Sequence, residues 1–519
     1  MCAGKFSIRL VLGVGFAIGG VALAEGDTQE IAVGNVTELV TALSVAVAGQ
    51  DGVYKITLNP GEYDFSTCEE SQHGNFWGVN YGDDGNGVSC LQVKREVVLQ
   101  GKDETHYSKK TREQETVLKG AGRILYLCSA SGARSSVFNI TFEGGVAPGN
   151  STGGGILVTS DGNYANQGLI SNCVFRSCHS NYRGGAVSGV KAVDCLFEGN
   201  GAKQGGASNK GLLENCVFTE NTASESYGSA LRDSIAVGCE FKENGSGSVY
   251  NSSVTNSIFY VNPVHTAHGS EARNSSLYGC RFLAQNVGVT NDARSVVYGG
   301  TVANCVIGPL RLTDKNSVVC NVEYIRNTLF SECVAKNLIY NNAGLKDGDG
   351  NVVATDIANC TFVDNALNTV NGGLVFSENA GATCRVYNTI CAGNKIDYPS
   401  STHHDKSADL AVRTYNGGVA LVSHSLCKTL PPAGMVASGV LDGEGVRKGV
   451  DPLFVDKSDF PEMPYLISKR SPARNAGVYQ EWMASAKDLA GIARIAEGAV
   501  DMGCYEWGYT KCGLVLVFR

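Results

Sequence analysis

The middle of the chain repeats a short phrase in which apolar and variable positions alternate. Each copy places Cys and Phe two residues apart, with one variable residue between them. The clearest copies occupy residues 172–175, 194–197, 215–218, 238–241 and 279–282. The variable residue is charged at Glu240 and Arg281, so we expect this position to face water while Cys and Phe face inward. A period of two is typical of a β-strand.

The copies return at an almost constant interval. After Cys173, the next cysteines of the series stand 22, 21 and 23 residues further on, at Cys195, Cys216 and Cys239. Weaker copies extend the series at residues 139–142, 257–259, 305–307, 327–330, 359–362 and 388–390. A period of this size predicts a solenoid, whose coils are stable only against their neighbours.

About 22 residues per coil with three short strands favours an all-β fold, a right-handed parallel β-helix similar to the pectate-lyase-like solenoids. A leucine-rich repeat would need a Leu-x-x-Leu-x-Leu pattern and an internal Asn ladder, and we find neither in the sequence. About ten to twelve coils at a strand spacing of about 4.8 Å predict a rod roughly 50–60 Å long.

A turn residue follows each Phe three positions later. The turn residues are Asn200, Asn221, Asn244 and Asn262, with Cys178 in the first copy. Asn tolerates left-handed backbone and hydrogen-bonds its own chain, so these residues predict a tight corner in every coil. Glycine-rich stretches follow the corner, for example at residues 184–187 and 205–208.

The N-terminal end of the rod needs a cover, because an open end is a template for further strands. A helix is predicted over residues 35–48, with a capping box formed by Asn35 and Glu38 and a stop at Gly49. Its apolar face consists of Val36, Leu39, Val40, Leu43 and Val47. A first strand at 56–58, a corner at 59–61 and a second strand at 63–65 follow. This segment is predicted to cap the rod, with a partner-binding helix as the alternative.

The pattern changes after Pro431 and Pro432. Beyond them stand distinctive phrases at residues 451–456, 471–477, 488–491, 494–495 and 500–506. These phrases resemble the C-terminal region of bacterial choice-of-anchor Q proteins, with departures at Arg474–Asn475, Ala493 and Cys504. The Phe-x-x-Asn and Gly-Gly-Ala phrases are similar to chlamydial-type polymorphic outer membrane protein repeats. The resemblances cover most of residues 120–506 and imply a β-helix at or outside the bacterial surface, without implying a reaction.

The first 24 residues predict a secretory signal peptide, with Lys5 and Arg9, an apolar core over 10–21, and a cleavage site at 22–24. About a dozen apolar residues cannot span a bilayer, and no other segment is long enough to be transmembrane. We therefore expect an exported protein, extracellular or at the bacterial cell surface or outer membrane. The predicted parts are the signal peptide (1–24), the N-terminal cap and first coils (25–120), the β-helix repeats (121–428) and a C-terminal choice-of-anchor-like module (429–519). The segment 514–518 is either a last strand or a sorting tag.

Composition agrees with short strands joined by many corners. The 519 residues include 65 glycines, and only 18% of residues are charged. The net charge of −8 and the lack of a basic run argue against nucleic acid or an anionic membrane surface as a partner. Oligomeric state is not readable from these features.

The 19 cysteines suggest disulfides in an exported chain, but the repeat geometry argues otherwise. Equivalent cysteines on adjacent coils would have Cβ atoms about 4.8 Å apart, wider than the ~3.8 Å that a disulfide prefers. The simpler interpretation is a file of buried thiols, with disulfides or metal as alternatives. Cys68 with Cys90, and Cys504 with Cys512, are better disulfide candidates.

Two pairs of acids could be catalytic if the protein cleaves polysaccharides. Glu220 and Glu243 stand two residues past the Phe on adjacent coils, and Glu332 and Asp364 do so on coils separated by an insertion. A lyase or glycosidase needs such acids gathered on neighbouring coils. The alternative is that they are solvated corner residues, and no Arg or Lys recurs near them as a base. The catalytic residues therefore stay unknown at this stage.

Three other features could bind ligands. Asp347, Asp349 and Asn351 alternate oxygen ligands like part of a calcium loop, but the Gly and Glu of a full loop are missing, so a bare turn is the alternative. The loop with His403, His404, Asp405 and Asp409 could bind a metal, although exposed polar filler is the better interpretation. Trp77 could stack on a sugar or pack the first coil.

The sequence thus favours a secreted or surface-displayed β-helix presenting an extended face for binding a polysaccharide or cell-surface glycan, or for adhesion, without catalysis. No cofactor is firmly indicated, and Ca²⁺ is the one candidate. The alternative function is a polysaccharide lyase or glycoside hydrolase acting along the β-helix face.

Overall fold

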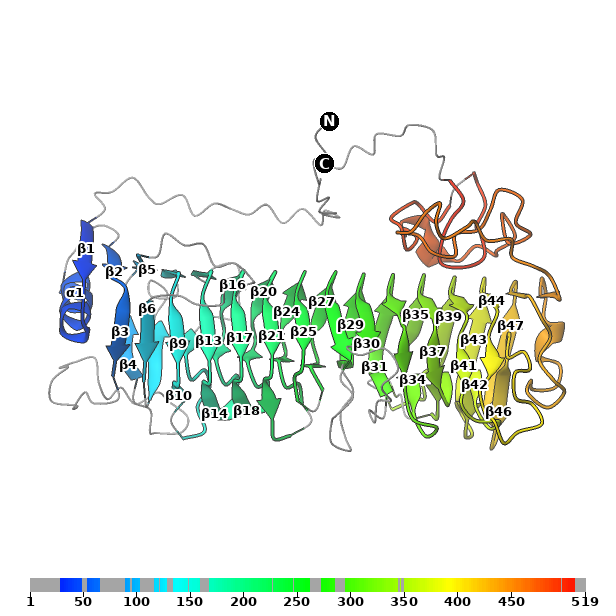
Figure 1. Ribbon diagram of the computed structural model, residues 1–519, viewed down its shortest axis with the longest axis horizontal. Helices are drawn as coiled ribbons and strands as arrows, with labels where there is room; N and C mark the ends of the chain where they lie inside the picture. Colours follow the sequence, from blue (N-terminus) through cyan, green and yellow to red (C-terminus); the bar gives the residue numbers. More distant parts are fainter. Residues whose placement is uncertain are drawn as a thin grey trace.

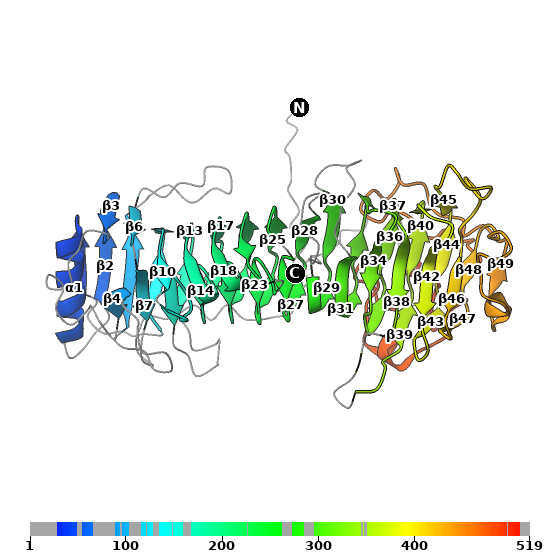
Figure 2. The same cartoon turned by 90° about the horizontal axis from the view of Figure 1, so that it is seen from below.

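The computed structural model describes residues 29–48, 54–65, 89–93, 96–102, 116–120, 122–127, 134–147, 149–158, 168–225, 227–245, 247–261, 272–284, 295–343, 346, 350–495 and 497–508. The chain is a right-handed parallel β-helix with an N-terminal helix against its first coil and a C-terminal segment folded back over its last coils (Figure 1). Every strand pair of the ladders is parallel, and Figure 2 shows the strands of successive coils lying side by side along the rod.

The largest sheet, sheet A, has 26 strands and contributes two strands to most coils. Its strands are β1 (Gln29–Val33), β2 (Tyr54–Leu58), β4 (Ser89–Val93), β5 (Val97–Gly101), β7 (Arg123–Leu127), β8 (Ser136–Phe138), β11 (Ile156–Val158), β12 (Leu169–Ser171), β15 (Val187–Ser188), β16 (Lys191–Val193), β19 (Ser208–Asn209), β20 (Leu212–Glu214), β23 (Leu231–Arg232), β24 (Ile235–Val237), β26 (Val249–Tyr250), β27 (Ser253–Thr255), β29 (Ala272–Tyr278), β31 (Ser295–Ala303), β34 (Ser317–Cys320), β35 (Tyr324–Arg326), β38 (Asn337–Asn341), β39 (Thr355–Ala358), β42 (Gly373–Glu378), β43 (Thr383–Tyr387), β46 (Val412–Tyr415) and β47 (Val419–Ser423).

Sheet B has 15 strands and carries the repeated phrase. Its strands are β3 (Gly61–Asp64), β6 (Thr116–Lys119), β9 (Thr141–Glu143), β13 (Val174–Arg176), β17 (Leu196–Glu198), β21 (Val217–Thr219), β25 (Glu240–Lys242), β28 (Ile258–Val261), β30 (Arg281–Ala284), β32 (Val306–Ile307), β36 (Leu329–Ser331), β40 (Thr361–Val363), β44 (Ile390–Ala392), β48 (Leu426–Cys427) and β49 (Arg447–Lys448). Two four-stranded sheets complete the coils: sheet C with β10 (Val146–Ala147), β14 (His179–Arg183), β18 (Gly201–Gln204) and β22 (Thr222–Ala223), and sheet D with β33 (Leu310–Arg311), β37 (Cys333–Ala335), β41 (Ala366–Leu367) and β45 (Lys395–Ile396).

A coil of the central region contains four short strands where three were expected. Between residues 187 and 204, β15 and β16 both belong to sheet A, β17 to sheet B and β18 to sheet C. The extra strand arises because sheet A bends at a left-handed residue, Gly189 in this coil, with φ of 72°. The bend divides one predicted strand into two.

Stacked aromatic rings fill the interior, as predicted. Seven Phe rings follow one another on adjacent coils, with centroids 4.5–5.2 Å apart and planes within 14° of parallel. This Phe file contains Phe142, Phe175, Phe197, Phe218, Phe241, Phe259 and Phe282. Burial of this apolar surface is the main stabilising term of a solenoid, since each coil shields the next.

The cysteines of the repeat are buried free thiols, as predicted. Each S–H donates to the carbonyl two residues earlier, for example from Cys195 to Val193 at 3.3 Å. Burial raises the pKa of Cys195, Cys216 and Cys239 well above the usual value, and that of Cys178 to about 12. Cys504 is also a free buried thiol, so its proposed pairing with Cys512 is not found. The side chains of Cys68, Cys90 and Cys512 lie outside the described residues.

The predicted corner residues turn out to be interior ones. Asn200, Asn221 and Asn244 are buried, and the left-handed residue is the one before them, such as Glu220 with φ of 57°. The side-chain amide of Asn200 donates to Asn221 Oδ1, and that of Asn221 donates to Asn244 Oδ1, both at 2.9 Å. The sequence was therefore misread twice, because an internal Asn ladder exists and the corner is one residue earlier. Asn262 lies outside the described residues.

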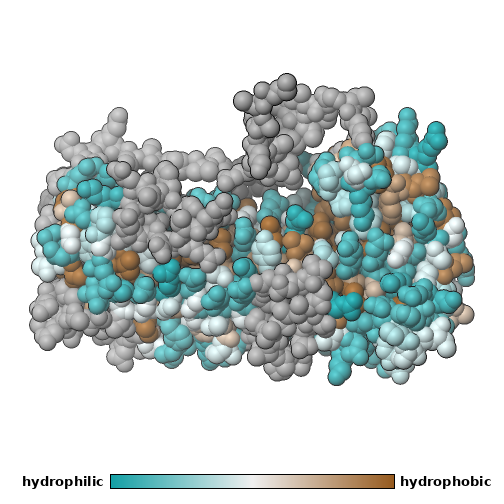
Figure 3. All heavy atoms as spheres, viewed as in Figure 1, coloured by the Kyte–Doolittle hydropathy of each residue, from teal (hydrophilic) through white to brown (hydrophobic). Residues whose placement is uncertain are grey.

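The variable position of the phrase faces outward, but not always into water. Arg281 is exposed and Glu240 is half-buried, as expected. Val174, Leu196 and Val217 occupy the same position on adjacent strands, are buried, and form a small cluster of their own. Our expectation of exposure is wrong for these three residues, because in-register apolar side chains pack on one another. Elsewhere on this side of the rod, hydrophilic residues cover most of the described surface (Figure 3).

The N-terminal cap forms as predicted. Helix α1 (Val36–Ala48) begins with a capping box, in which the Glu38 amide donates to Asn35 Oδ1 at 2.9 Å and Asn35 Nδ2 donates to Glu38 Oε1 at 2.8 Å. Leu39 and Leu43 are buried in the core of the first coil. Strand β1, which precedes the helix and pairs with β2, was not predicted. No helix within the described ranges is long and apolar enough to cross a membrane.

The C-terminal segment of residues 450–508 lies against the outer face of sheet B over the last coils (Figure 1). Its regular structure is limited to isolated antiparallel bridges and the short helix η5 (Glu481–Ala484), while η4 (Val440–Asp442) packs beside β47 before it. Met463, Leu466 and Tyr505 bury Leu329 and Val363 of the coils. These contacts make the segment part of the rod's hydrophobic structure.

Candidate ligand-binding surface

One row of outward side chains on sheet A combines aromatic rings with guanidinium groups. The residue before each member, such as Val249 or Ala272, is buried in the core, so strand alternation turns the member outward. We call this set the Tyr–Arg row; its members are in register on successive strands from β23 to β46. The members are Arg232, Tyr250, Arg273, Tyr298, Cys320, Tyr340, Phe376 and Arg413.

The first half of the row is held by cation–π contacts. The Arg273 guanidinium lies 5.5 Å from the Tyr298 ring centroid and 6.0 Å from that of Tyr227. Arg232 lies 5.4 Å from the centroid of Tyr250 and 5.7 Å from that of Tyr227. Such contacts keep the arginines extended along the surface. They use the flat face of the guanidinium, so its N–H groups at the edge can still donate hydrogen bonds.

The two arginines differ in charge compensation. Arg232 Nε lies 3.0 Å from Asp233 Oδ2, which neutralises it. Among the described residues, no carboxylate lies within 4.0 Å of the Arg273 guanidinium, and its buried Nε has no hydrogen-bond partner. Arg273 is therefore a cation that lies between two tyrosine rings and has an N–H donor without a hydrogen-bond partner.

The second half of the row is more apolar. The Tyr340 and Phe376 rings lie 5.9 Å apart, and the Tyr340 hydroxyl donates to Glu378. Burial raises the pKa of Tyr340, and the bond to Glu378 adds to the shift. The row ends at Arg413, whose backbone pairs with Phe376. Cys320 and Phe376 are buried, whereas Tyr340 and Arg413 are half-buried, so the exposed aromatic surface of this half is interrupted.

The acid pair Glu332 and Asp364 does lie at one corner of adjacent coils, with φ of 56° and 54°. The C-terminal segment occupies this corner, because Lys457 Nζ lies 4.0 Å from Glu332 Oε1 and 3.7 Å from Asp364 Oδ2. The Tyr465 hydroxyl donates to Asp364 at 2.7 Å and accepts from Lys457 at 2.6 Å. Lys457 thus shares its single positive charge between the two carboxylates, and with Tyr465 it fastens the segment to the coils, a structural role.

The pair Glu220 and Glu243 also occupies left-handed corners of adjacent coils, with φ of 57° and 52°. Lys242 Nζ lies 3.7 Å from Glu243 Oε1, again an ion pair at a surface corner. The arrangement fits the prediction of solvated corner residues better than that of a catalytic pair.

The remaining predicted ligand-binding residues either lie outside the described residues or have a role in holding the fold. Asp347, Asp349 and Trp77 lie outside the described residues, so the calcium prediction with Asn351 stays a prediction. Within the part of the chain that the structure describes, no group of three or more His, Cys, Asp or Glu residues could hold a metal ion.

Asp409 is not exposed filler as expected. It is buried, and its Oδ1 accepts from Asn394 Nδ2 at 2.8 Å while Oδ2 accepts from the Thr429 amide at 3.1 Å. It thereby ends the Asn ladder of the last coils. His404 and Asp405, by contrast, form a surface contact of 3.4 Å, as polar loop residues do.

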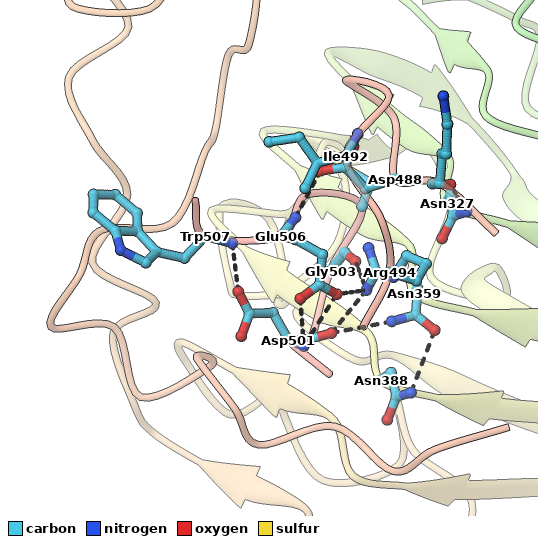
Figure 4. Close-up of polar contacts among 12 residues, drawn as sticks. Asn327, Asn359, Asn388, Asp488, Ile492, Arg494, Asp501, Gly503, Glu506 and Trp507 are labelled. Atoms are coloured by element: carbon cyan, nitrogen blue, oxygen red, sulfur yellow. Dashed lines mark hydrogen bonds and ion pairs between the residues drawn. The ribbon is translucent and has the colours of Figure 1, made fainter. Parts of the chain in front are cut away.

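The charged residues of the C-terminal phrases form a buried cluster (Figure 4). Arg494 is fully buried, pairs with Glu506 Oε1 at 2.9 Å, and donates to the carbonyls of Asp501 and Gly503 at 2.8 and 3.0 Å. The Asp488 carboxylate accepts from the backbone amides of Ile492 and Glu506 at 2.7 and 2.8 Å. Burial raises the pKa of Glu506 to about 8 despite the neighbouring Arg494. These residues hold the segment together and leave no acid free for chemistry.

Sequence reasoning missed the Tyr–Arg row, although a signal for it existed. An apolar residue is followed by Arg or Tyr in Leu231–Arg232, Val249–Tyr250 and Val297–Tyr298, each within a few residues of a glycine. The alternation predicts that the second residue faces out. Unequal coil lengths in this region hid the register that aligns them.

Neither a protein-family model nor a curated protein sequence matches the chain. Solved structures with a similar course of the chain include a mannuronic acid-specific polysaccharide family 6 lyase from human gut microbiota, at 10% identity and TM-score 0.37, covering 84% of this chain and 93% of that one. Pectate lyase Pel9A matches at 13% identity and TM-score 0.26, over 93% and 97%. The Streptococcus pneumoniae surface protein and adhesin PfbA matches at 11% identity and TM-score 0.22, over 76% and 96%. At this level the similarities carry no information about activity.

Proposed function

We propose that this protein is an exported, non-catalytic β-helix that binds an extended polysaccharide along the Tyr–Arg row. The observation that supports it is the in-register series of arginines and tyrosines, with Arg273 lacking a carboxylate partner among the described residues. Export rests on the predicted signal peptide at residues 1–24.

The chemistry of the row matches that of a sugar chain. Tyrosine rings offer flat apolar platforms for the C–H face of a pyranose, and guanidinium groups donate paired hydrogen bonds to hydroxyls or carboxylates. The strand spacing of about 4.8 Å is close to the length of one sugar ring in an extended chain. A polysaccharide parallel to the rod would therefore meet one half-buried side chain per ring along β23, β26, β29 and β31.

The spacing of like residues supports the same geometry. Arg232 and Arg273 are two strands apart, as are Tyr250 and Tyr298, so each type recurs at about 10 Å. A two-ring repeat on the ligand would present the same group to the same residue type each time. Many weak contacts along a line also suit retention of a polymer more than of a monosaccharide.

The test is retention of the secreted protein on a panel of immobilised neutral and acidic polysaccharides. Arg273→Gln and Tyr298→Ala are each expected to weaken binding about twofold to tenfold, because each removes one ring or cation contact. Arg281→Gln is the matched control, since it removes the same charge from exposed sheet B and should leave binding unchanged. Equal loss in Arg273→Gln and Arg281→Gln would show general charge attraction and contradict the proposal.

The same panel tests the alternative of a lyase or glycosidase. The proposal expects neither new unsaturated ends nor new reducing ends, with or without Ca²⁺. Product formation that disappears in Glu332→Gln or Asp364→Asn, with folding intact, would replace the binding function by catalysis at the corner beside Lys457.

A further inference from the structure

The C-terminal end of the Tyr–Arg row opens into a pocket. The pocket has a volume of about 500 Å³, within the range of small-molecule sites. The loop after β45, the segment around residue 435 and strand β46 meet here. The walls include Val370, Tyr398, His403, Arg413 and Met435, with hydroxyl side chains at residues 400–402.

Arg413 is the charged group of this pocket. Its Nη1 donates to the carbonyl of Val370, lies 3.5 Å from the carbonyl of Gly372, and contacts Met435 Sδ at 3.8 Å. None of these contacts is with a carboxylate, so the positive charge is not compensated by the described residues. Arg413 is half-buried, and this partial removal from water lowers its pKa. A guanidinium keeps its charge even then.

The acids of the pocket loop are engaged elsewhere. Asp397 pairs with Arg311 at 3.7 Å, and Asp405 pairs with Lys395 at 3.4 Å. Asp409 is buried beneath the loop against Asn394. The open side of the pocket therefore presents cationic, aromatic and hydroxyl groups, and no acid is among its walls.

The loop that forms one wall is ordered by its own turns. The Ser401 amide donates to the Tyr398 carbonyl at 2.9 Å, and the His403 amide donates to Ser401 Oγ at 3.0 Å. The Asp405 amide donates back to the Ile396 carbonyl at 2.8 Å. These bonds place the Tyr398 ring, which is 37% exposed, and the hydroxyls beside Arg413 without a ligand. A preformed wall reduces the entropy lost on binding.

We propose that this pocket binds a carboxylated sugar residue, with Arg413 on the carboxylate and Tyr398 against the ring. Arg413 is the last member of the Tyr–Arg row, one strand beyond Phe376, so a chain lying along the row would place its terminal residue here. In this form the inference rests on the proposed function. A free acidic monosaccharide presents the same chemistry and could also occupy the site.

The test is calorimetric titration of the full chain with D-glucuronate, D-galacturonate and a hexauronide, with D-glucose as the uncharged control. One of the two monouronates is expected to bind and glucose at least tenfold more weakly. Arg413→Gln should weaken uronate binding about tenfold or more, and Tyr398→Ala about threefold. Tyr398 lies on an exposed loop, so this variant keeps the test valid if Arg413→Gln unfolds, which a melting curve would reveal.

Two comparisons separate the sources and the two proposals. If a hexauronide binds with the same dependence on Arg413, the ligand of the pocket is the end of a polysaccharide chain. If only the monouronate binds, the ligand is a free acidic monosaccharide. Polymer retention without any monouronate binding would overturn the pocket and leave the row intact. Monouronate binding that is lost in Arg413→Gln but unchanged in Arg273→Gln, without polymer retention, would support the pocket and overturn the row.

Discussion

The two halves of the rod use one corner of the repeat in different ways. In the N-terminal coils, residues 168–284, the left-handed residue before the Cys is Asn at two places, Asn172 and Asn215, and both are half-buried. In the C-terminal coils, residues 301–427, the equivalent Asn388 donates to the carbonyl of Val478 at 2.8 Å and accepts from its amide at 2.7 Å. The backbone conformation is the same, with φ near 50° in both halves. The left-handed backbone therefore accounts for Asn at this corner in both halves. In the C-terminal coils, the side-chain amide of Asn388 also binds the C-terminal segment.

The outer face of sheet B shows the same division. One position after the Phe, the N-terminal coils carry Arg176, Glu198 and Lys242, and the first two form an ion pair at 3.1 Å. The C-terminal coils carry Val363 and Ala392 there, and both are buried under the segment. The comparison teaches that the two halves share the backbone corner but differ on the outside, where apolar side chains let the C-terminal segment pack on the last coils.

The largest expected effect comes from removing a stacked Phe ring from the interior of either half. Phe218→Ala removes a ring stacked on both neighbours, at 4.8 and 5.2 Å between centroids. Phe362→Ala removes a ring stacked on Phe330 alone, because Cys391 occupies the next coil. Each change should lower the free energy of unfolding by about 3–5 kcal/mol, with about 0.5–1.5 kcal/mol more for Phe218. Urea denaturation measures both, and equal losses would mean that stacking adds nothing beyond burial.

A pH effect should separate the C-terminal segment from the coils. The pKa of Glu506 is raised by burial from 4.5 to about 8, so its stabilising contribution is complete below about pH 4.5 and is lost as pH rises through 8. The segment should therefore lose about 2–4 kcal/mol of local stability over this range, while the Phe file stays folded. Hydrogen exchange at residues 488–506 between pH 5 and 9 measures it.

The matched variant for the pH effect is Glu506→Gln, which accepts hydrogen bonds but does not titrate. Its exchange rates, corrected for intrinsic chemistry, should vary much less with pH than those of the natural chain. An unchanged pH slope in this variant would assign the effect to Asp488 or Asp501, whose pKa values burial also raises.

A smaller effect should come from the corner Asn itself. Asn388→Gly keeps the left-handed conformation but removes the bonds to Val478, so we expect a local loss of about 1–3 kcal/mol in the C-terminal segment. Asn215→Gly makes the same backbone change where no segment docks, and should cost under about 0.5 kcal/mol. Limited proteolysis of both variants compares them. Similar sensitivity would show that the amide does not hold the segment.

The smallest expected effect is on thiol reactivity in the native protein. Cys195 and Cys360 are buried in the two halves, so both should resist alkylation until denaturation. Cys427, in the last of the Cys-bearing coils, should react first, because coils at the end of a solenoid open most easily. Mass spectrometry of alkylated peptides gives the order. Fast native labelling of Cys195 would contradict the packed interior.

Local patterns were enough for the architecture but not for the candidate sites. The alternation and period around Phe197, Phe218 and Phe241 predicted the stacked interior, and Asn35 with Glu38 predicted the N-terminal cap. The Asn ladder was missed because a buried Asn and a corner Asn look the same in a sequence. Lys457 could not be placed beside Asp364, since their contact joins residues 93 positions apart and depends on how the C-terminal segment folds back.

The chain by itself determined a coiled β-structure, its apolar interior and its capped start, because strand alternation and helix capping act between residues a few positions apart. Only the tertiary structure decided that Arg273 and Tyr298 share a row, that the row ends at the Arg413 pocket, and that a segment covers the last coils. The physical reason is register. Which outward side chains become neighbours depends on the combined length of the turns between their strands. The sequence of one coil alone does not determine that length.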